Sequence, residues 1–284
     1  MLFDITSDIH LDFWIDNTGS KNKQVRQMKE MLEKLIPENQ STILIIAGDI
    51  GHYNTQNALF LKLIKERYEH VLWVHGNHDL YMVSKSILKK FKNSSSLRLA
   101  EMTSMANDVG AIRLDGSVVD IGGVKFGGAG GWYDTAYAVQ EFGLTTEAVR
   151  NMWYTVMNDC NFIKENGLNI DFELMALEER LKIKSIINHS DVIITHVPPE
   201  WTNIPFKYKN AHSTFWRFDG SEFLDILKEN TIWIYGHVHD KIYSKHPSGV
   251  IMAANPLGYP MENGYNNISR RVFVTMDTLN PWMY

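Results

Sequence analysis

Short runs of consecutive apolar residues alternate along this chain with longer segments in which apolar residues recur every three or four positions. Runs such as Ile43–Ala47 and Val71–Val74 are typical of strands buried on both faces of a sheet. Helical spacing separates or follows the early runs, over Lys21–Ile36, Asn57–Tyr68 and Ser84–Phe91. This order of strands and helices predicts a parallel sheet wound by right-handed crossovers.

The spacing changes from Leu97 onward, where we expect short strands. Ile112–Leu114, Val118–Ile121 and Val124–Phe126 are separated by Asp-Gly and Gly-Gly pairs, which are typical of hairpin turns. The glycine-rich residues 127–131 follow this hairpin instead of opening a helix, so they do not fit a dinucleotide-binding loop. We interpret these glycines as positions of close backbone approach, between strands or at a site.

Helical spacing returns over Thr145–Lys164 and Phe172–Asn188, where we expect a helical pair, at about residues 145–188, that covers a sheet face or caps the site. The remaining strands are expected at Leu2–Ser7, Asp191–Thr195, Ile232–Tyr235, Gly249–Ala254 and Arg271–Met276, with a loop at Gly258–Asn267. No segment rich in Pro or Ser divides the chain, so residues 1–284 are predicted to form a single domain.

Polar side chains that can bind metal ions stand at the ends of five of the predicted strands. They are Asp8 and His10, Asp49, Asn77 and His78, His196, and His237 and His239. Open α/β sheets bind their ligands at the carboxyl ends of the strands. We therefore expect these side chains to meet in one crevice.

The set of side chains favours a particular chemistry. Carboxylate, imidazole and one amide oxygen suit a divalent transition ion, and Asp49 is the natural bridge if two ions share the crevice. Two ions roughly 3.5–4 Å apart would lower the pKa of a bridging water and clamp the attacking and leaving oxygens of a phosphoryl displacement. The pattern therefore predicts hydrolysis of a phosphoester by a metal-bridging hydroxide.

Composition narrows the setting of this chemistry. The net charge of -5 provides no basic surface for sequence-independent binding of nucleic acid, which makes a nucleic-acid partner unlikely. The single cysteine, Cys160, cannot form an internal disulfide, and no apolar stretch approaches the length of a membrane span. Because the first ten residues form a predicted strand with candidate ligands, we expect no signal peptide and a cytoplasmic protein.

Five motifs occur together and in a fixed order: Ser7-Asp8-Ile9-His10, Gly48-Asp49, Gly76-Asn77-His78-Asp79, Thr195-His196 and Gly236-His237-Val238-His239. They resemble the signature blocks of the calcineurin-like metallophosphoesterase superfamily. The tail over residues 254–262 also resembles a closing block of a bacterial and phage branch of uncharacterised members. The resemblance implies an α/β fold, a four-layer α/β/β/α sandwich of two mixed sheets with the metal site at the strand carboxyl ends.

The resemblance also implies roles for individual residues. One ion would be held by Asp8, His10, Asp49 and His239, and the second by Asp49, Asn77, His196 and His237. His78 would donate a proton to the leaving group, and Asp79 would orient His78 through a ring N–H bond. Two divalent ions are implied. Manganese is the first expectation, and iron, nickel and zinc are alternatives because they bind the same types of ligand.

Two departures from the protein Ser/Thr phosphatases of this superfamily bear on the substrate. Ile50, Gly51 and His52 follow Asp49 where that branch has an Asp-Arg-Gly run, and Asp79 stands where it has Glu. The missing arginine removes a phosphate clamp, so we do not expect protein dephosphorylation.

A small phosphodiester or nucleotide-like molecule is the expected substrate. The first alternative is a phosphomonoesterase. A nuclease ranks below it, and a metal-binding module without catalytic activity ranks last. The candidate substrate contacts are His52, Tyr53, Trp132, Tyr133 and His212. A loop position or core packing is the structural alternative for each of them. The pattern leaves the oligomeric state open.

Overall fold

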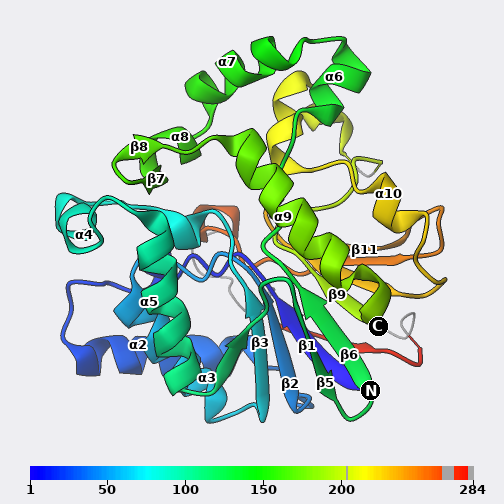
Figure 1. Ribbon diagram of the computed structural model, residues 1–284. Helices are drawn as coiled ribbons and strands as arrows, with labels where there is room; N and C mark the ends of the chain where they lie inside the picture. The colour runs from blue at the N-terminus through cyan, green and yellow to red at the C-terminus, as the bar shows by residue number, and fades with distance from the viewer. Residues whose placement is uncertain (203, 264–271, 281–284) are drawn as a thin grey trace.

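Two β-sheets stacked face to face form the centre of the molecule (Figure 1). The computed structural model describes residues 1–202, 204–263 and 272–280. The first sheet has the strand order β13-β1-β2-β3-β4, with bounds Val274–Asp277, Leu2–Thr6, Ile43–Ala47, His70–Val74 and Ala111–Arg113. Strands β1 to β4 run parallel, and only β13 is antiparallel to its neighbour.

The second sheet has the order β11-β12-β10-β9-β6-β5, with bounds Ile242–Lys245, Ile251–Ala254, Ile232–Tyr235, Val192–Ile194, Val124–Gly128 and Ser117–Ile121. Its central strands are parallel, and the two edge strands β11 and β5 are antiparallel to their neighbours. Both sheets are therefore mixed, as predicted.

Alternate residues of the central strands face two different layers. On β2, Ile43, Ile45 and Ala47 join the core between the sheets, whereas Leu44 and Ile46 join the core beneath the helices. All of them are buried. Burial on both faces explains why the strand is a continuous apolar run in the sequence.

Helices cover the outer face of each sheet. The first sheet is covered by α2 (Lys21–Leu35), α3 (Asn54–Lys65) and α5 (Ser95–Asp108), and the second by α9 (Phe172–Ile186) on the opposite side (Figure 1). Short helices α1 (Leu11–Trp14) and α4 (Lys85–Lys90) lie in the loops after β1 and β3. The arrangement confirms the predicted four-layer sandwich.

Helix α5 corrects the expectation of short strands from Leu97 onward. Ser94 caps its first turn by accepting a hydrogen bond from the Leu97 N–H at 3.4 Å. The buried face of the helix includes Ser95 and Arg98 as well as apolar residues. Because polar residues share that face, the apolar spacing is too weak to reveal the helix.

Strand β4 also differs from expectation. The Asp115-Gly116 pair was predicted to join Ile112–Leu114 and Val118–Ile121 in a hairpin, but β4 pairs with β3 in the first sheet and β5 belongs to the second. The turn carries the chain between sheets, with Gly116 at φ 69°. The second predicted hairpin is confirmed, since β5 and β6 pair antiparallel around Gly122-Gly123.

The segment between β6 and β9 adds structure beyond the strand ends. It contains α6 (Ala136–Phe142), α7 (Thr146–Val156), α8 (Asp159–Phe162), a small hairpin of β7 (Lys164–Glu165) and β8 (Leu168–Asn169), α9, and the 3₁₀ helix Ile187–His189. The single helix expected over Thr145–Lys164 is thus interrupted, because the chain turns at Met157. Helices α7 and α9 are in contact through Trp153 and Phe172, whose ring centroids are 5.1 Å apart.

Short helices lie in the connections between the last strands. Phe206–Tyr208, Ala211–Trp216 and Ser221–Leu224 (α10) lie between β9 and β10, and Pro260–Asn263 lies between β12 and β13. Of the predicted strand Arg271–Met276 and loop Gly258–Asn267, residues 264–267 and Arg271 lie outside the described residues. Among the residues described, no helix combines the length and apolar character needed to cross a membrane.

Candidate metal centre

The structure brings the seven predicted ligands together at one end of the stacked sheets. They follow β1, β2 and β3 of the first sheet and β9 and β10 of the second: Asp8, His10, Asp49, Asn77, His196, His237 and His239. All but His239 are buried, and the His239 side chain is 18% exposed. The two sheets therefore contribute ligand side chains to a common centre.

The backbone at this centre is in an uncommon conformation. Five of the nine described non-glycine residues with positive φ are predicted ligands: Asp8 (48°), His10 (45°), Asp49 (56°), His237 (69°) and His239 (51°). L-residues adopt the left-handed region at a cost, and such residues cluster at functional sites. The cost indicates that side-chain placement here outweighs local backbone preference.

Glycines next to the ligands leave room for them. A Cβ at Gly76 would overlap Asp49 Oδ1, and a Cβ at Gly236 would lie 2.6 Å from Asp8 Oδ2. The same reasoning applies to Gly130, whose Cβ would overlap the ring of His75. This confirms that the glycine-rich run allows close approach.

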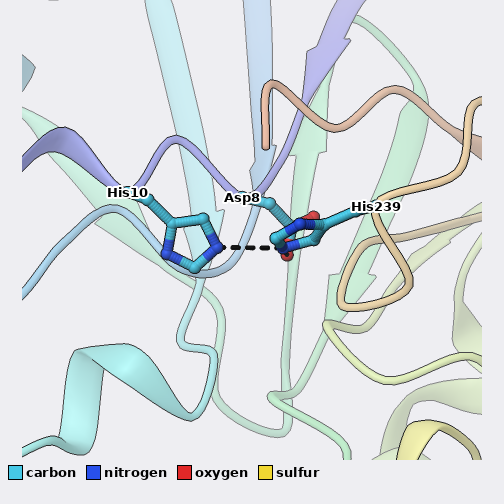
Figure 2. A group of neighbouring side chains, drawn as sticks. All are labelled: Asp8, His10 and His239. Atoms are coloured by element: carbon cyan, nitrogen blue, oxygen red, sulfur yellow. Dashed lines mark hydrogen bonds and ion pairs between the residues drawn. The ribbon is translucent and has the colours of Figure 1, made fainter. Parts of the chain in front are cut away.

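The first group of ligands comes from β1 and β10. Figure 2 shows the rings of His10 and His239 meeting beside the carboxylate of Asp8. The two Nε2 atoms are 3.0 Å apart, and His239 Nε2 lies 3.4 Å from Asp8 Oδ1. Three potential ligand atoms thus converge on one point.

The second group is centred on His196. Its Nδ1–H donates to the Ala47 carbonyl at 2.8 Å, so Nε2 is the nitrogen that can ligate a metal. That Nε2 faces two further acceptors, Asn77 Oδ1 and Asp49 Oδ2, each at 3.3 Å. A positive charge at this point, either a proton on Nε2 or a bound cation, satisfies all three atoms.

Asp49 connects the two groups. Its Oδ2 atom lies 3.3 Å from His196 Nε2 and 3.8 Å from His10 Nε2, and its Oδ1 accepts the backbone N–H of His78 at 2.8 Å. His237 lies on the side of His196, with ring centroids 5.0 Å apart. Its Nε2–H donates to the Phe215 carbonyl at 3.0 Å, so Nδ1 is the nitrogen that can ligate.

The carboxylates control the charge of their neighbours. Burial alone would raise the pKa of Asp8, but His239 beside it holds the pKa below its ordinary value. Burial alone would lower the pKa values of His239 and His196, but the neighbouring carboxylates have the larger effect. Asp8 raises the pKa of His239 to about 10, and Asp49 raises the pKa of His196 to about 9. The buried carboxylates therefore attract positive charge into the centre.

Two other imidazoles are neutral at pH 7. Burial, with His78 nearby, lowers the pKa of His10 to about 3, and burial, with His196 nearby, lowers that of His237 to about 4. Neutral imidazole is the form that binds metal. Nitrogen and oxygen donors, two buried carboxylates and convergent lone pairs together fit divalent transition ions.

Asp79 has a different role from the one expected. Its carboxylate accepts backbone N–H groups from Asp49 and Gly76 at 2.9 Å, Ile50 at 3.1 Å and Gly51 at 3.3 Å. The prediction that it orients His78 through a ring N–H bond is therefore wrong. The backbone donors of the two strand-end loops take up its oxygens, and Asp79 ties those loops together.

His52 is the partner of the His78 ring instead. The distance from His52 Nε2 to His78 Nδ1 is 2.8 Å, and His52 Nδ1 lies 2.7 Å from Asp12 Oδ2. Because the carboxylate accepts from Nδ1, His52 Nε2 accepts from His78 Nδ1–H, which directs His78 Nε2 toward Tyr259 OH at 3.4 Å. Burial lowers the pKa of His78 to about 4.

Arg98 supports the same loops from helix α5. Its buried guanidinium donates to the carbonyls of Gly51 at 3.0 Å and His78 at 3.4 Å, and also to the carbonyl of Asp79. Neither Arg98 nor Asp12 was predicted from the sequence as part of the site. Arg98 bonds to backbone carbonyls, which every residue has, so no pattern of side chains in the sequence indicates its role.

A cavity of about 350 Å³ opens in front of the candidate ligands. Its described wall includes the aromatic residues Tyr81, Tyr208, Trp216 and Tyr259, the apolar residues Val156 and Met157, and the charged residues Arg217, Asp240 and Glu262. Tyr259 stacks on His10 with centroids 4.5 Å apart. Of these wall residues, the sequence singled out only Tyr259 and Glu262, which lie in the family-like segment 254–262.

The predicted substrate contacts lie elsewhere. His52 is behind His78, Tyr53 is half-buried before α3, Trp132 and Tyr133 are buried, and His212 is exposed. None of the five belongs to the described wall of the cavity. Trp132 lines a separate cavity against α9, and the hydroxyl of Tyr133 is bonded to Asp159 at 2.6 Å. The cavity therefore gives no support to direct contact by these residues, and their contact with substrate stays a prediction.

Comparison with known proteins identifies relatives of the chain. The family model described as calcineurin-like phosphoesterase matches residues 1–241. An uncharacterised protein of Acanthamoeba polyphaga mimivirus is 24% identical over 96% of both chains. The [acyl-carrier-protein] phosphodiesterase PptH of Mycobacterium tuberculosis is 27% identical over 84 residues, 30% of this chain and 25% of that protein.

A solved structure shares the fold. The crystal structure of the phosphopantetheinyl hydrolase PptH from Mycobacterium tuberculosis superposes with a TM-score of 0.71, at 17% identity, over 96% of this chain and 95% of that one. At this identity the similarity establishes the architecture and leaves the substrate to be argued from the site.

Proposed function

The chain belongs to the calcineurin-like phosphoesterase family, and from this premise we propose that it uses two divalent ions to hydrolyse a small phosphodiester. The observation that carries the proposal is the position of Asp49. Its Oδ2 atom lies within 4 Å of both His10 Nε2, at 3.8 Å, and His196 Nε2, at 3.3 Å. A carboxylate so placed can serve both ions.

The proposed ligands divide into two sets that share Asp49. One ion would be held by Asp8, His10, Asp49 and His239, and the other by Asp49, Asn77, His196 and His237. When bound, two ions activate water for attack and neutralise charge on the phosphoryl oxygens. Manganese is the first choice of metal, and a cytoplasmic location remains our prediction.

His78 is the proposed proton donor to the leaving oxygen. Its Nδ1–H is engaged by His52, so its Nε2 faces the cavity, whose wall includes His78. Asp12 holds His52 through the ring Nδ1 at 2.7 Å and through the backbone N–H at 3.0 Å. Asp12 thereby stabilises, through His52, the additional proton that His78 must carry before it donates one.

The cavity supports a small organic phosphoester. About 350 Å³ is within the range of small-molecule sites, roughly 300–1,000 Å³. Tyr208 and Trp216 offer aromatic surface to organic groups on the phosphate, and Arg217 offers positive charge. Aromatic surface beyond the ligands favours a diester, with an organic group on each side, over a monoester.

Hydrolysis of bis-p-nitrophenyl phosphate and p-nitrophenyl phosphate with Mn²⁺ tests the proposal. We expect the diester to be turned over faster, and turnover of the monoester alone would contradict the diesterase part. A phosphopantetheinylated carrier protein belongs in the panel, because the mycobacterial relative is named as an acyl-carrier-protein phosphodiesterase. Protein with both ions bound that cleaves no phosphoester, with or without His78→Ala, would favour the non-catalytic module.

A further inference from the structure

Asp159 lies at the start of helix α8, in the segment inserted between β6 and β9, and is fully buried. Its Oδ1 accepts from Asn77 Nδ2 at 2.9 Å and from Tyr81 OH at 2.5 Å. Its Oδ2 accepts from Tyr133 OH at 2.6 Å, and Trp153 Nε1–H donates to that same phenol oxygen at 2.6 Å. The carboxylate is thus held by three donors.

This contact determines which end of the Asn77 amide faces the metal centre. The Asn77 atom that faces Asp159 Oδ1 is Nδ2, so the amide presents its NH₂ group to the carboxyl group. The amide oxygen is then directed to the other side, where it lies 3.3 Å from His196 Nε2. With the amide reversed, an NH₂ group would face the ion and a carbonyl oxygen would face a carboxylate.

Packing alone does not account for a carboxylate at this position. Burying one costs several kcal/mol unless it is fully hydrogen-bonded, and an apolar side chain would fill the space without that cost. The donors to Asp159 come from two parts of the chain: Asn77 and Tyr81 flank the turn after β3, and Tyr133 follows β6. Trp153, which donates to Tyr133, is on α7. The network therefore connects the inserted helices to one ligand.

We propose that Asp159 is a positioning residue that fixes the Asn77 amide with its oxygen toward the second ion, so that the inserted segment 136–163 completes that ion's site. The inference rests on the proposed function, because it takes Asn77 as a ligand. Asp159 itself contacts neither ion nor substrate in this assignment. It acts only through the Asn77 side chain.

The other ion has an analogous support, which provides an internal comparison. The carboxylate of Glu262 lies 2.9 and 3.1 Å from His239 Nδ1, so the ring directs Nε2 toward Asp8 and His10. Outer partners of this kind fix the orientation of ligands, and their loss typically weakens metal binding about 10–100-fold. Glu262 and Asp159 should therefore affect different ions.

Titration of the purified full chain with Mn²⁺, followed by calorimetry and electron paramagnetic resonance, tests the proposal. Wild type should bind two ions and show the signal of a spin-coupled pair. Asp159→Asn should weaken one binding step about 10–100-fold, leave the other unchanged, and lose the coupled signal at limiting Mn²⁺. Glu262→Gln should weaken the opposite step.

A double-mutant cycle separates positioning from general packing. Asn77→Ala should weaken the same step as Asp159→Asn, and Asp159→Asn should add nothing in the Asn77→Ala background. Asp134→Asn is the matched control, since Asp134 accepts from the backbone of Ala136 and Asp219 at 2.9 Å. That variant should bind both ions as wild type does.

The outcomes distinguish the two proposals. Wild type that binds fewer than two ions contradicts the dinuclear function itself. Wild type with two ions and Asp159→Asn with unchanged affinities, or with both steps weakened equally, contradicts the positioning role. If Asp159→Asn does not fold, Tyr133→Phe decides, because it removes one donor to the carboxylate: the same single step should weaken, and unchanged binding would overturn the inference.

Discussion

The candidate ligands and the residues that hold them in place come from two different kinds of sequence. The ligands on β1, β2 and β3 lie within a few residues of a buried apolar strand, in the first 80 positions. An outer partner can come from far along the chain: Asp159 is 82 positions from Asn77. Only the first kind has a local pattern that can be recognised.

The contrast has a physical origin. A ligand must stand where parallel strands end, and strand ends are visible as the boundary between apolar and small or polar residues. An outer partner needs only one hydrogen-bonding atom at the right point in space, which any neighbouring element can supply. Substitution of a ligand should therefore have a larger effect on metal binding or turnover than substitution of an outer partner, and an effect of a different kind.

Asp49→Asn should have the largest effect. An amide in place of the shared carboxylate removes charge from both ions, so both should be lost and turnover should fall to background. Metal content and hydrolysis of the diester check this. Retention of one tightly bound ion would show that Asp49 does not serve both.

His78→Ala should come next, with both ions retained and kcat reduced about 10²–10⁴-fold, the usual size of general-acid effects. The comparison is sharpest with metal content measured on the same sample. Loss of metal in this variant would instead make His78 a ligand, which its position near His10 and Asp49 allows geometrically.

His52→Ala and Asp12→Asn should be weaker, about 10-fold in kcat, because both residues act through the His78 ring. Neither should lower turnover further in the His78→Ala background, since the shared route is already lost. An additive effect of the second substitution would mean that these residues contribute by another path.

Trp216→Ala should have the smallest of these effects, about a fivefold increase in KM with kcat maintained, from the loss of an aromatic wall. His212→Ala is the control, because His212 is exposed and lies off the described wall of the cavity. The reverse outcome, with KM changed by His212→Ala alone, would restore the contact expected from the sequence.

The sequence was most informative where one interaction dominates. Ile43–Ala47 is a strand in both prediction and structure, because burial on both faces leaves only apolar residues there. It failed at α5, where Arg98 is buried to hold backbone carbonyls, and at β4, which joins a different sheet from β5. Asp79 was placed at the site for a reason that the structure corrects, since backbone amides and not His78 occupy its oxygens.

The most direct test of the account is a crystal structure of the Mn²⁺-loaded protein with anomalous scattering measured at the manganese edge. Two peaks roughly 3.5–4 Å apart should appear, with Asp49 between them and the Asn77 oxygen facing one of them. A single peak, or two peaks that do not share Asp49, would contradict the dinuclear centre.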